Sequence, residues 1–321
     1  MIVLIMKERL KPLFLQKQEA LLRRLPKIHK LYPKIERDYK KSLAGYNGEK
    51  SIDYFLSYLK EEYLIFHNVR LLDRKHYFQM DTLIITPSFA CILEVKNIAG
   101  SIYINEETGQ MIRTLDGKEE GFLSPLIQVR RQQDHFSLWL KEQKIPNIPC
   151  IGFVVLSNPS TILKSSNSLI LQAARIPSKF LHLENKYKEI KLKKQSINRL
   201  SARITDSHTE NDVSIIEHYQ LLKSEIITGV QCPFCETIPL MKTFGFWACQ
   251  KCGQKSKNAH TKALTDYKLL FSERISNREV RSFLHIKSSS SAKRVLQKLH
   301  YPFTGNTKDR IYYIKSNQSE K

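Results

Sequence analysis

The chain has 321 residues, 41% of them hydrophobic and 10% aromatic, and its formal net charge is +21. This composition excludes wholesale disorder, and the length predicts two or three domains. The opening MIVLIMKERL has six apolar residues before its first charge, too few for a secretion signal or a membrane span. We therefore expect a cytoplasmic protein with reduced thiols and no membrane partner.

The positive charge is concentrated at the two ends of the chain. Residues 1–44 have a net charge of +8, residues 45–230 of +2 and residues 231–321 of +11. Basic flanks favour polyanions, meaning nucleic acid or an anionic membrane surface, although a solvated basic surface has the same composition. Because both flanks are basic and the middle contains an acidic constellation, we favour nucleic acid.

The first predicted elements are helical. Residues 1–41 form a basic extension that reads as one helix or two, broken near Pro26 and Pro33. In the following GYNGEKSIDYFL, Glu49 falls on the same helical face as the apolar residues. Glu49 thus lies where a hydrophobic residue is expected.

The segment 42–230 then alternates between strands and helices. YLIFHNVRL, YFQMDTLIIT and ACILEVKN are predicted as successive strands, followed by a hairpin that turns at Thr108 and Gly109. A helix is expected from Pro125 to about Lys144, then a buried strand at PCIGFVVLSN, a strand at Ile176–Leu181 and two helical segments. This order predicts an α/β domain with a mixed sheet flanked by helices.

Two neighbouring strands place charged residues where a core strand has apolar ones. In CILEVKN, Glu94 and Lys96 are two residues apart and so point to the same face. Folding the preceding hairpin about Pro87 and Ser88 sets Asp81 opposite Glu94, with Cβ atoms about 5 Å apart. Two carboxylates this close repel unless a proton or a cation lies between them. Their hard oxygen ligands predict Mg²⁺ or Mn²⁺, with Lys96 placed to orient an attacking water or to stabilise negative charge on a phosphoryl group.

The order of these motifs resembles a known family. An Asp, a spacer of about a dozen residues and Glu-x-Lys on the next strand resemble the PD-(D/E)xK nuclease superfamily. The pieces GYNGEKSIDYFL, QMDTLIIT, CILEVKNIAGSI and SPLIQVRRQ resemble its NERD branch, the nuclease-related domain, over residues 42–157. The resemblance implies a restriction-endonuclease-like core that acts in DNA processing. It also implies these site residues: Glu49, Asp81, Glu94, Lys96 and, as a supporting residue, Gln128.

Each of these residues has a simpler interpretation when it is taken alone. Glu-x-Lys is a common surface ion pair, Asp81 could cap a bulge, and Glu49 could be an acid of a first helical turn. Gln128 shares a helical stripe with Gln132 and His135, which could be a solvent-exposed face. The complete ordered set favours the nuclease interpretation. One departure is Ile98, where the family commonly has an aromatic residue, and it removes no catalytic group.

A second motif is a set of paired cysteines in residues 231–256. Cys232, Cys235, Cys249 and Cys252 have the spacing C-x2-C-x13-C-x2-C, which predicts a structural zinc ribbon. Gly253 suits the turn after the second pair. Disulfides or a redox pair are the alternatives, and Cys91 and Cys150 are expected in the core. The aromatic residues Phe244, Phe246 and Trp247 either stack on unpaired bases or form the small core of the ribbon, and we expect at least one to be buried.

The remaining residues, 257–321, are predicted as a basic helical region. Ser276 and Ser291 are the expected helix N-caps, and a hairpin is expected to turn at Gly305. Helix, helix, helix and hairpin is the order of a winged helix, which we favour over the alternative of a helical cap that packs on the ribbon. A winged helix would offer these residues to DNA from its third helix and its wing: Lys293, Arg294, Lys298, Lys308 and Arg310.

The sequence therefore predicts a cytoplasmic Mg²⁺- or Mn²⁺-dependent DNA nuclease with a structural Zn²⁺. Its fold class is α/β, with a restriction-endonuclease-like mixed sheet flanked by helices, a small zinc ribbon and a winged-helix-like C-terminal region. The alternative is a catalytically inactive adaptor that binds nucleic acid and keeps the nuclease fold as a scaffold. RNA is not excluded as the partner, because basic flanks do not distinguish the sugar.

Overall fold

The structure is a computed structural model that describes residues 4–146, 148–306 and 309–315. Contacts within the chain divide it into two compact units. Unit 1 comprises Met1–Lys11 and Lys41–Asn211, and unit 2 comprises Pro12–Lys40 and Asp212–Lys321. The four predicted segments, 1–41, 42–230, 231–256 and 257–321, differ from these units. The difference arises because the N-terminal residues contribute to both units.

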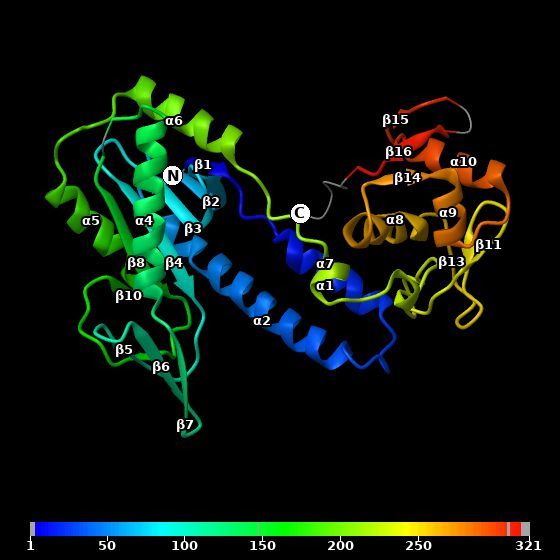
Figure 1. Ribbon diagram of the computed structural model, residues 1–321, viewed down its shortest axis with the longest axis horizontal. Helices are drawn as coiled ribbons and strands as arrows, with labels where there is room; N and C mark the ends of the chain where they lie inside the picture. The colour runs from blue at the N-terminus through cyan, green and yellow to red at the C-terminus, as the bar shows by residue number, and fades with distance from the viewer. Residues whose placement is uncertain (1–3, 147, 307–308, 316–321) are drawn as a thin grey trace. The chain divides into compact units, whose positions relative to one another are not determined.

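Unit 1 is built on a mixed sheet (Figure 1), which confirms the predicted α/β class. Its described strands are β1 (Leu4–Lys7), β2 (Leu64–Leu72), β3 (Tyr77–Ile85), β4 (Ala90–Lys96), β8 (Cys150–Leu156) and β10 (Ile170–Gln172). Their order in the sheet is β1-β2-β3-β4-β8-β10. The neighbours β2, β3 and β4 are antiparallel, whereas β4, β8 and β10 run parallel and β1 is parallel to β2. The strands β2, β3, β4 and β8 lie where the sequence predicts them.

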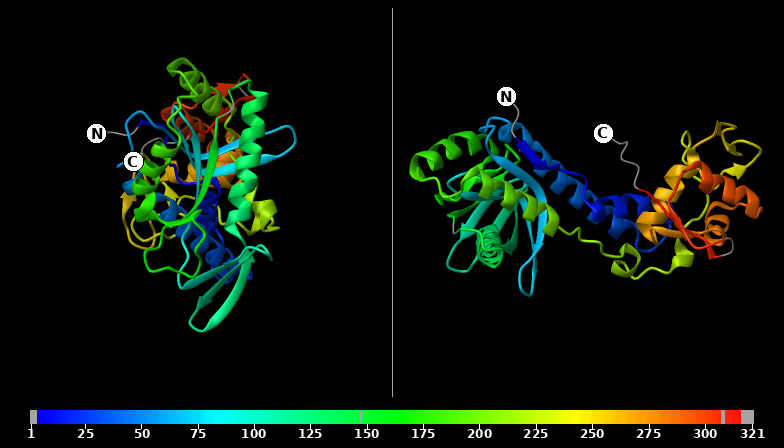
Figure 2. Two further views of the ribbon diagram at one scale, coloured as in Figure 1. Left: turned by 90° about the vertical axis from the view of Figure 1, so that its left-hand side faces the viewer. Right: turned by 90° about the horizontal axis from the view of Figure 1, so that it is seen from above.

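Helices cover both faces of this sheet. They are α3 (Asp53–Leu56), α4 (Pro125–Glu142), α5 (Ile176–Lys186), α6 (Lys194–Ser207) and a 3-10 turn at Ala173–Arg175. The last turns of α2 (Tyr32–Ser51) meet the end of β4. Successive residues of β4 alternate between two cores: Ile92 packs with α4 and α6, and Leu93 packs with α3 and α5. The views in Figure 2 show α4 running along the sheet. By the same alternation, Glu94 belongs to the face that α4 covers.

A second, smaller sheet follows β4 in the chain. It contains β5 (Ser101–Asn105), β6 (Gln110–Leu115), β7 (Lys118–Leu123) and β9 (Ile162–Leu163), in the order β7-β6-β5-β9. The predicted hairpin turn is confirmed, with Gly109 at φ +67°. The strand β7 is not among the predicted elements. Its signal is the Asp116–Gly117 pair, in which both residues have positive φ, as a two-residue hairpin turn requires.

Two local predictions are wrong. Residues Ile176–Leu181 are the start of helix α5, because Pro177 suits a first helical turn and Ile176, Phe180 and Leu183 bury one helical face. The strand expected there is β10, which lies earlier in the chain. Ser291 is not an N-cap: its helix begins at Ser289 and is capped by the Ser288 hydroxyl. The other predicted cap, Ser276, is confirmed by a capping box with Glu279.

The N-terminal part of unit 2 is helical. It contains α1 (Leu13–Arg24), the first turns of α2, α7 (Ile215–His218) and a 3-10 turn at Lys223–Glu225. The chain breaks near Pro26 as predicted, but Pro33 lies in the first turn of α2, where a proline is tolerated. Arg24 is fully buried and donates to Asp266 Oδ2 at 2.8 Å and to two backbone carbonyls. Part of the basic N-terminal charge therefore stabilises the fold.

The C-terminal part of unit 2 combines the cysteine ribbon with a helical region. The ribbon strands are β11 (Met241–Lys242), β12 (Trp247–Ala248) and β13 (Lys255–Ser256). The elements that follow are α8 (Ala259–Leu270), β14 (Arg274–Ser276), α9 (Asn277–Leu284), α10 (Ser289–Lys298), β15 (Phe303–Thr304) and β16 (Ile311–Tyr313). Side chains from the ribbon and from α8, α9 and α10 share one hydrophobic core. Among the described residues, no helix has the length and apolar character needed to cross a membrane.

Candidate functional site

The hairpin of β3 and β4 brings the two predicted carboxylates to neighbouring positions. The strands pair Ile85 with Ala90 and continue to Thr82 with Leu93, the register expected from a turn at residues 87 and 88. The next positions along this ladder are Asp81 and Glu94. There Asp81 Oδ2 accepts a hydrogen bond from the Val95 amide at 2.9 Å. The Asp81 carboxylate is thus fixed against the backbone of β4 beside Glu94.

Lys96 is held between two of the predicted site residues. Its ammonium donates to Glu94 Oε1 at 2.6 Å and to Gln128 Oε1 at 3.0 Å. The Glu94 side chain is 2% exposed and that of Lys96 is 27% exposed, so the ion pair joins a buried acid to a cation that reaches solvent. Such a short charge-assisted contact fixes the direction of the lysine.

The helix α4 supplies a site residue that sequence reasoning missed. Gln132 is buried, and its amide donates to Glu94 Oε2 at 2.7 Å and to the Gln79 carbonyl at 2.9 Å. The two oxygens of Glu94 therefore have separate partners, Lys96 and Gln132. The available signal was the spacing of Gln128 and Gln132, which places both on one side of α4. His135, on the same stripe, pairs with Asp73 instead and stacks on Phe78.

Glu49 reaches the site from helix α2, which lies very close to the end of β4. A Cβ atom built on Gly48 would lie 2.5 Å from Asn97 Cβ, whereas one built on Gly45 meets nothing within 4 Å. Asn97 also donates to the Ala44 carbonyl at 2.8 Å. Gly48 therefore permits the close approach that sets the position of Glu49, and the first glycine of the motif does not.

Arg9 is the second residue that the sequence did not reveal. Its side chain is 3% exposed and donates to Glu49 Oε2 at 3.0 Å, to both oxygens of Asp53 and to the Thr82 hydroxyl at 2.9 Å. It also lies 3.4 Å from the Asp81 carbonyl. A guanidinium can make this many directed bonds because its five donors are fixed in one plane. The segment before α1 is therefore part of the candidate site.

The contact of Arg9 with His67 fixes the protonation of that histidine. Arg9 Nη2 lies 2.8 Å from His67 Nδ1, and a guanidinium has donors only, so Nδ1 accepts. The ring proton is then on Nε2, which faces Asp53 Oδ1 at 3.9 Å. Burial and the charges of Arg9 and Lys7 lower the pKa of His67 to about 3. His67 is a neutral partner of Arg9 at any pH near neutrality.

The carboxylates of the site disfavour one another's charged forms. Burial, together with the charges of Glu94 and Glu49, raises the pKa of Asp81 well above its ordinary value. Burial also raises the pKa of Glu49, against the opposing charge of Arg9. Both shifts mean that the charged forms of these two acids are disfavoured even with Lys96 and Arg9 nearby. A hard divalent cation fits the donor set, because carboxylate oxygens are the ligands it prefers and its charge would remove the repulsion.

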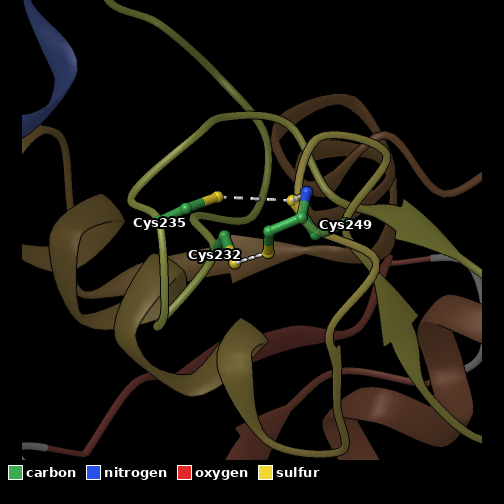
Figure 3. Close-up of side chains that lie close together, drawn as sticks. Cys232, Cys235 and Cys249 are labelled. Atoms are coloured by element: carbon green, nitrogen blue, oxygen red, sulfur yellow. Dashed lines mark hydrogen bonds between the residues drawn. The ribbon is translucent and has the colours of Figure 1, made fainter.

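The four predicted cysteines lie together in the structure, close enough to hold one metal ion. Their sulfur atoms all lie within 4.8 Å of one another. Among the described residues, these four cysteines are the group of three or more Cys, His, Asp or Glu side chains whose ligand atoms are close enough to hold one metal ion. Sγ–Sγ distances are 3.7 Å for Cys232 and Cys252 and 3.5 Å for Cys235 and Cys249 (Figure 3). Tetrahedral Zn–S bonds of about 2.3 Å give edges of about 3.8 Å, so four thiolates here fit Zn²⁺.

The two cysteine pairs sit on backbone turns of the same shape. The amide after each pair, of Glu236 and of Gly253, donates to the carbonyl of the first cysteine at 3.0 Å. Both of these residues have positive φ, +59° and +72°. The prediction that Gly253 serves this turn is confirmed, and Glu236 takes the same conformation at the other pair. The turns aim both pairs inward, which suits a closed structural site.

The predicted nucleic-acid-binding residues divide between an exposed helix face and the loop after β15. Lys293, Arg294 and Lys298 are exposed on α10, opposite its buried residues. Arg310 is half-buried with its guanidinium 4.1 Å above the Phe303 ring, and Lys308 lies outside the described residues. In the ribbon, Trp247 is buried as expected for at least one aromatic residue.

One comparison with known proteins matches the part of the chain that contains the candidate site. The fold and the two neighbouring strands define an α/β domain that has a mixed sheet and an acidic candidate site beside a lysine. Residues 44–157 match the NERD family model, described as "Nuclease-related domain". The match begins after Arg9 and includes Glu49, Asp81, Glu94, Lys96 and Gln128.

Other comparisons add little to this assignment. No curated protein matches the sequence. The crystal structure of protein VC1899 from Vibrio cholerae aligns with 12% identity and a TM-score of 0.20, over 50% of this chain and 37% of that one. The chain therefore spans little more than a third of the length of that protein, and a likeness of this size supports no argument about fold or function.

Proposed function

We propose that the protein is a Mg²⁺- or Mn²⁺-dependent nuclease that hydrolyses phosphodiester bonds in DNA. The observation that carries the proposal is the meeting of Asp81, Glu94 and Lys96 on two neighbouring strands of a nuclease-related domain. An acid pair whose charged forms are disfavoured by burial and repulsion, beside a lysine, suits both parts of phosphoryl transfer, which are cation binding and stabilisation of negative charge.

Each residue has a distinct proposed role. Asp81 and Glu94 would hold the divalent cation, which when bound supplies a Lewis acid and a hydroxide nucleophile near neutral pH. Lys96 stabilises negative charge on the phosphoryl oxygens, and Glu94 and Gln128 hold its ammonium in place. Gln132 holds the other oxygen of Glu94.

Glu49 has a more distant role in this proposal. It contributes negative charge at Asp81 and could bind a second cation through water, while Arg9 keeps its carboxylate in position. The guanidinium also fixes Asp53 and Thr82, so it acts as a positioning residue.

We propose that residues 257–321 bind DNA as a winged helix. The order α8, β14, α9, α10, β15, β16, with strands arranged β14-β16-β15, supports this topology. Helix α10 would enter a major groove with Lys293, Arg294 and Lys298. Replacing these three by Gln should reduce the slope of log K against log salt by about 0.9 for each phosphate that the variant no longer neutralises. An unchanged slope would favour a helical cap instead.

The direct test of the site is calorimetric binding of Mn²⁺. Asp81→Asn and Glu94→Gln should each abolish binding while the fold is kept, because either change removes a hard ligand. Glu189→Gln is a matched control, since Glu189 pairs with Lys191 away from the site. Unchanged Mn²⁺ affinity in both site variants would refute the proposal. An inactive adaptor is distinguished by metal binding without cleavage.

A further inference from the structure

A cavity of about 360 Å³ adjoins the candidate site on the side of the small sheet. Lys96 and Gln128, the two residues joined by a 3.0 Å hydrogen bond, form one wall. The opposite wall comes from β6 and β7, with Arg113, Phe122 and Leu123. The cavity thus begins at the proposed phosphate-binding lysine and extends over a sheet that no proposed catalytic residue occupies.

The lining combines two kinds of chemistry. The cations Lys96 and Arg113 favour a phosphate, although Arg113 also pairs with Glu120. Apart from Gln128, the other lining residues are apolar, and Phe122 is 43% exposed with Arg113 Cζ 5.6 Å from the centre of its ring. An exposed ring with a cation beside it suits a flat aromatic ligand that bears a negative charge.

The size of the cavity restricts what can enter. Pockets for small molecules measure about 300–1,000 Å³, and this one is near the lower limit. That space suits one nucleoside and is too small for a base pair with its stacked neighbours. A base must leave its duplex stack, or be unpaired already, to reach such a pocket.

We propose that this cavity binds a single unpaired nucleotide next to the bond that is cleaved, with its base against Phe122 and its phosphate at Lys96 and Arg113. The inference rests on the proposed nuclease function and names its substrate class as nucleic acid that is single-stranded at the cleavage point. Blunt duplex DNA has no such nucleotide and is a poor ligand for the pocket.

The test compares two trinucleotides of equal charge by calorimetry with the full-length protein. One is trithymidylate, and the other has the same phosphates and sugars without bases. The electrostatic contribution to the binding free energy is therefore the same for both trimers. Measurements at raised salt and without added divalent metal suppress nonspecific contacts and cleavage. A uridylate trimer run in parallel reports whether the pocket accepts both sugars.

The wild-type protein should bind trithymidylate about 5- to 100-fold more tightly than the abasic trimer, the range expected for stacking of one base. Phe122→Ser should abolish this preference. That residue lies on an exposed strand, so the variant should fold. Tyr103→Ser is the matched control, because Tyr103 is 49% exposed on the same sheet and does not line the cavity.

Two results would overturn the proposal: equal binding of the two trimers by the wild type, or a preference that survives Phe122→Ser. A preference that is lost instead in Phe244→Ser would place the base on the ribbon, where Phe244 is 95% exposed. Because no cleavage is measured, a catalytically inactive protein can still pass this test. A nuclease that acts on duplexes alone fails it.

Discussion

Gly48 and Asn97 lie so close that a Cβ atom on Gly48 would be 2.5 Å from Asn97 Cβ. The contact joins helix α2, which holds Glu49, to the end of β4, which holds Glu94 and Lys96. The relative position of the acids therefore depends on Gly48 having no side chain. Gly45, in the same helix, has open space around it.

This pair of glycines gives a matched experiment. Gly48→Ala should destabilise unit 1, because the backbone of α2 must move away from β4, and it should weaken Mn²⁺ binding. Gly45→Ala should be neutral or stabilising by up to about 1 kcal/mol, because alanine favours a helix over glycine. Urea unfolding and calorimetry measure both effects. Equal stability of the two variants would contradict the close packing described here.

Arg9 should be required for the geometry of the site although it lies outside the matched family segment. Arg9→Met leaves the half-buried acids Glu49 and Asp53 without their cation, so it should destabilise unit 1 by less than the roughly 3–5 kcal/mol lost when a fully buried pair is broken. Arg9→Lys restores charge without the planar set of donors, so it should recover part of the stability. The measurement is the free energy of unfolding of the wild type and of both variants. Arg9→Met with wild-type stability would show that the network contributes nothing.

His67 should make the stability of unit 1 depend on pH. Its pKa is about 3 in the folded protein and 6.5 when unperturbed, so the unfolded state binds more protons below pH 6.5. Stability is therefore lost as the pH falls from 6.5 towards 3, at up to about 1.4 kcal/mol per pH unit. His67→Gln removes this contribution. The difference in unfolding free energy between wild type and variant should shrink as the pH falls from 7 to 5. A difference that stays constant over this range would contradict the predicted contribution of His67.

Zinc binding should stabilise helices α8 to α10 as well as the ribbon. Purified protein should contain one Zn²⁺ per chain, and Cys249→Ser should unfold the ribbon and loosen α8 to α10, because Trp247 and Cys249 belong to their shared core. Unit 1 has its own cores and should survive. Cys150→Ser is the control, because Cys150 lies outside the cluster. Metal analysis that finds no zinc, or hydrogen exchange that leaves the helices protected in Cys249→Ser, would contradict this account.

The sequence predicts the centre of the site better than its surroundings. Asp81, Glu94 and Lys96 follow from strand alternation and one hairpin, which are local properties of the chain. Arg9 and Gln132 do not, because their roles depend on contacts 40 and 38 residues away in the sequence, with Glu49 and Glu94. A single sequence gives no signal for the contacts of Arg9, and for Gln132 it gives only the helical spacing from Gln128.

The errors in secondary structure have a similar origin. Residues 176–181 contain enough apolar residues to suit a short strand or a helix, and only packing of Phe180 and Leu183 selects the helix. The strand β7 is exposed along its whole length, so it lacks the apolar pattern that marks a buried strand. The cysteine pairs, by contrast, are recognised from spacing alone because zinc requires that geometry.

The most direct test of the central claim is cleavage of single-stranded, duplex and branched DNA by the wild type and by Lys96→Ala, with and without Mg²⁺ or Mn²⁺. We expect metal-dependent cleavage by the wild type and a loss of at least about 100-fold in Lys96→Ala, the size of effect seen when one charge-stabilising donor is removed. Lys188→Ala, an exposed lysine outside the site, should cleave like the wild type. Cleavage that needs no divalent metal, or that is unchanged in Lys96→Ala, would contradict the assignment of the nuclease site to Asp81, Glu94 and Lys96.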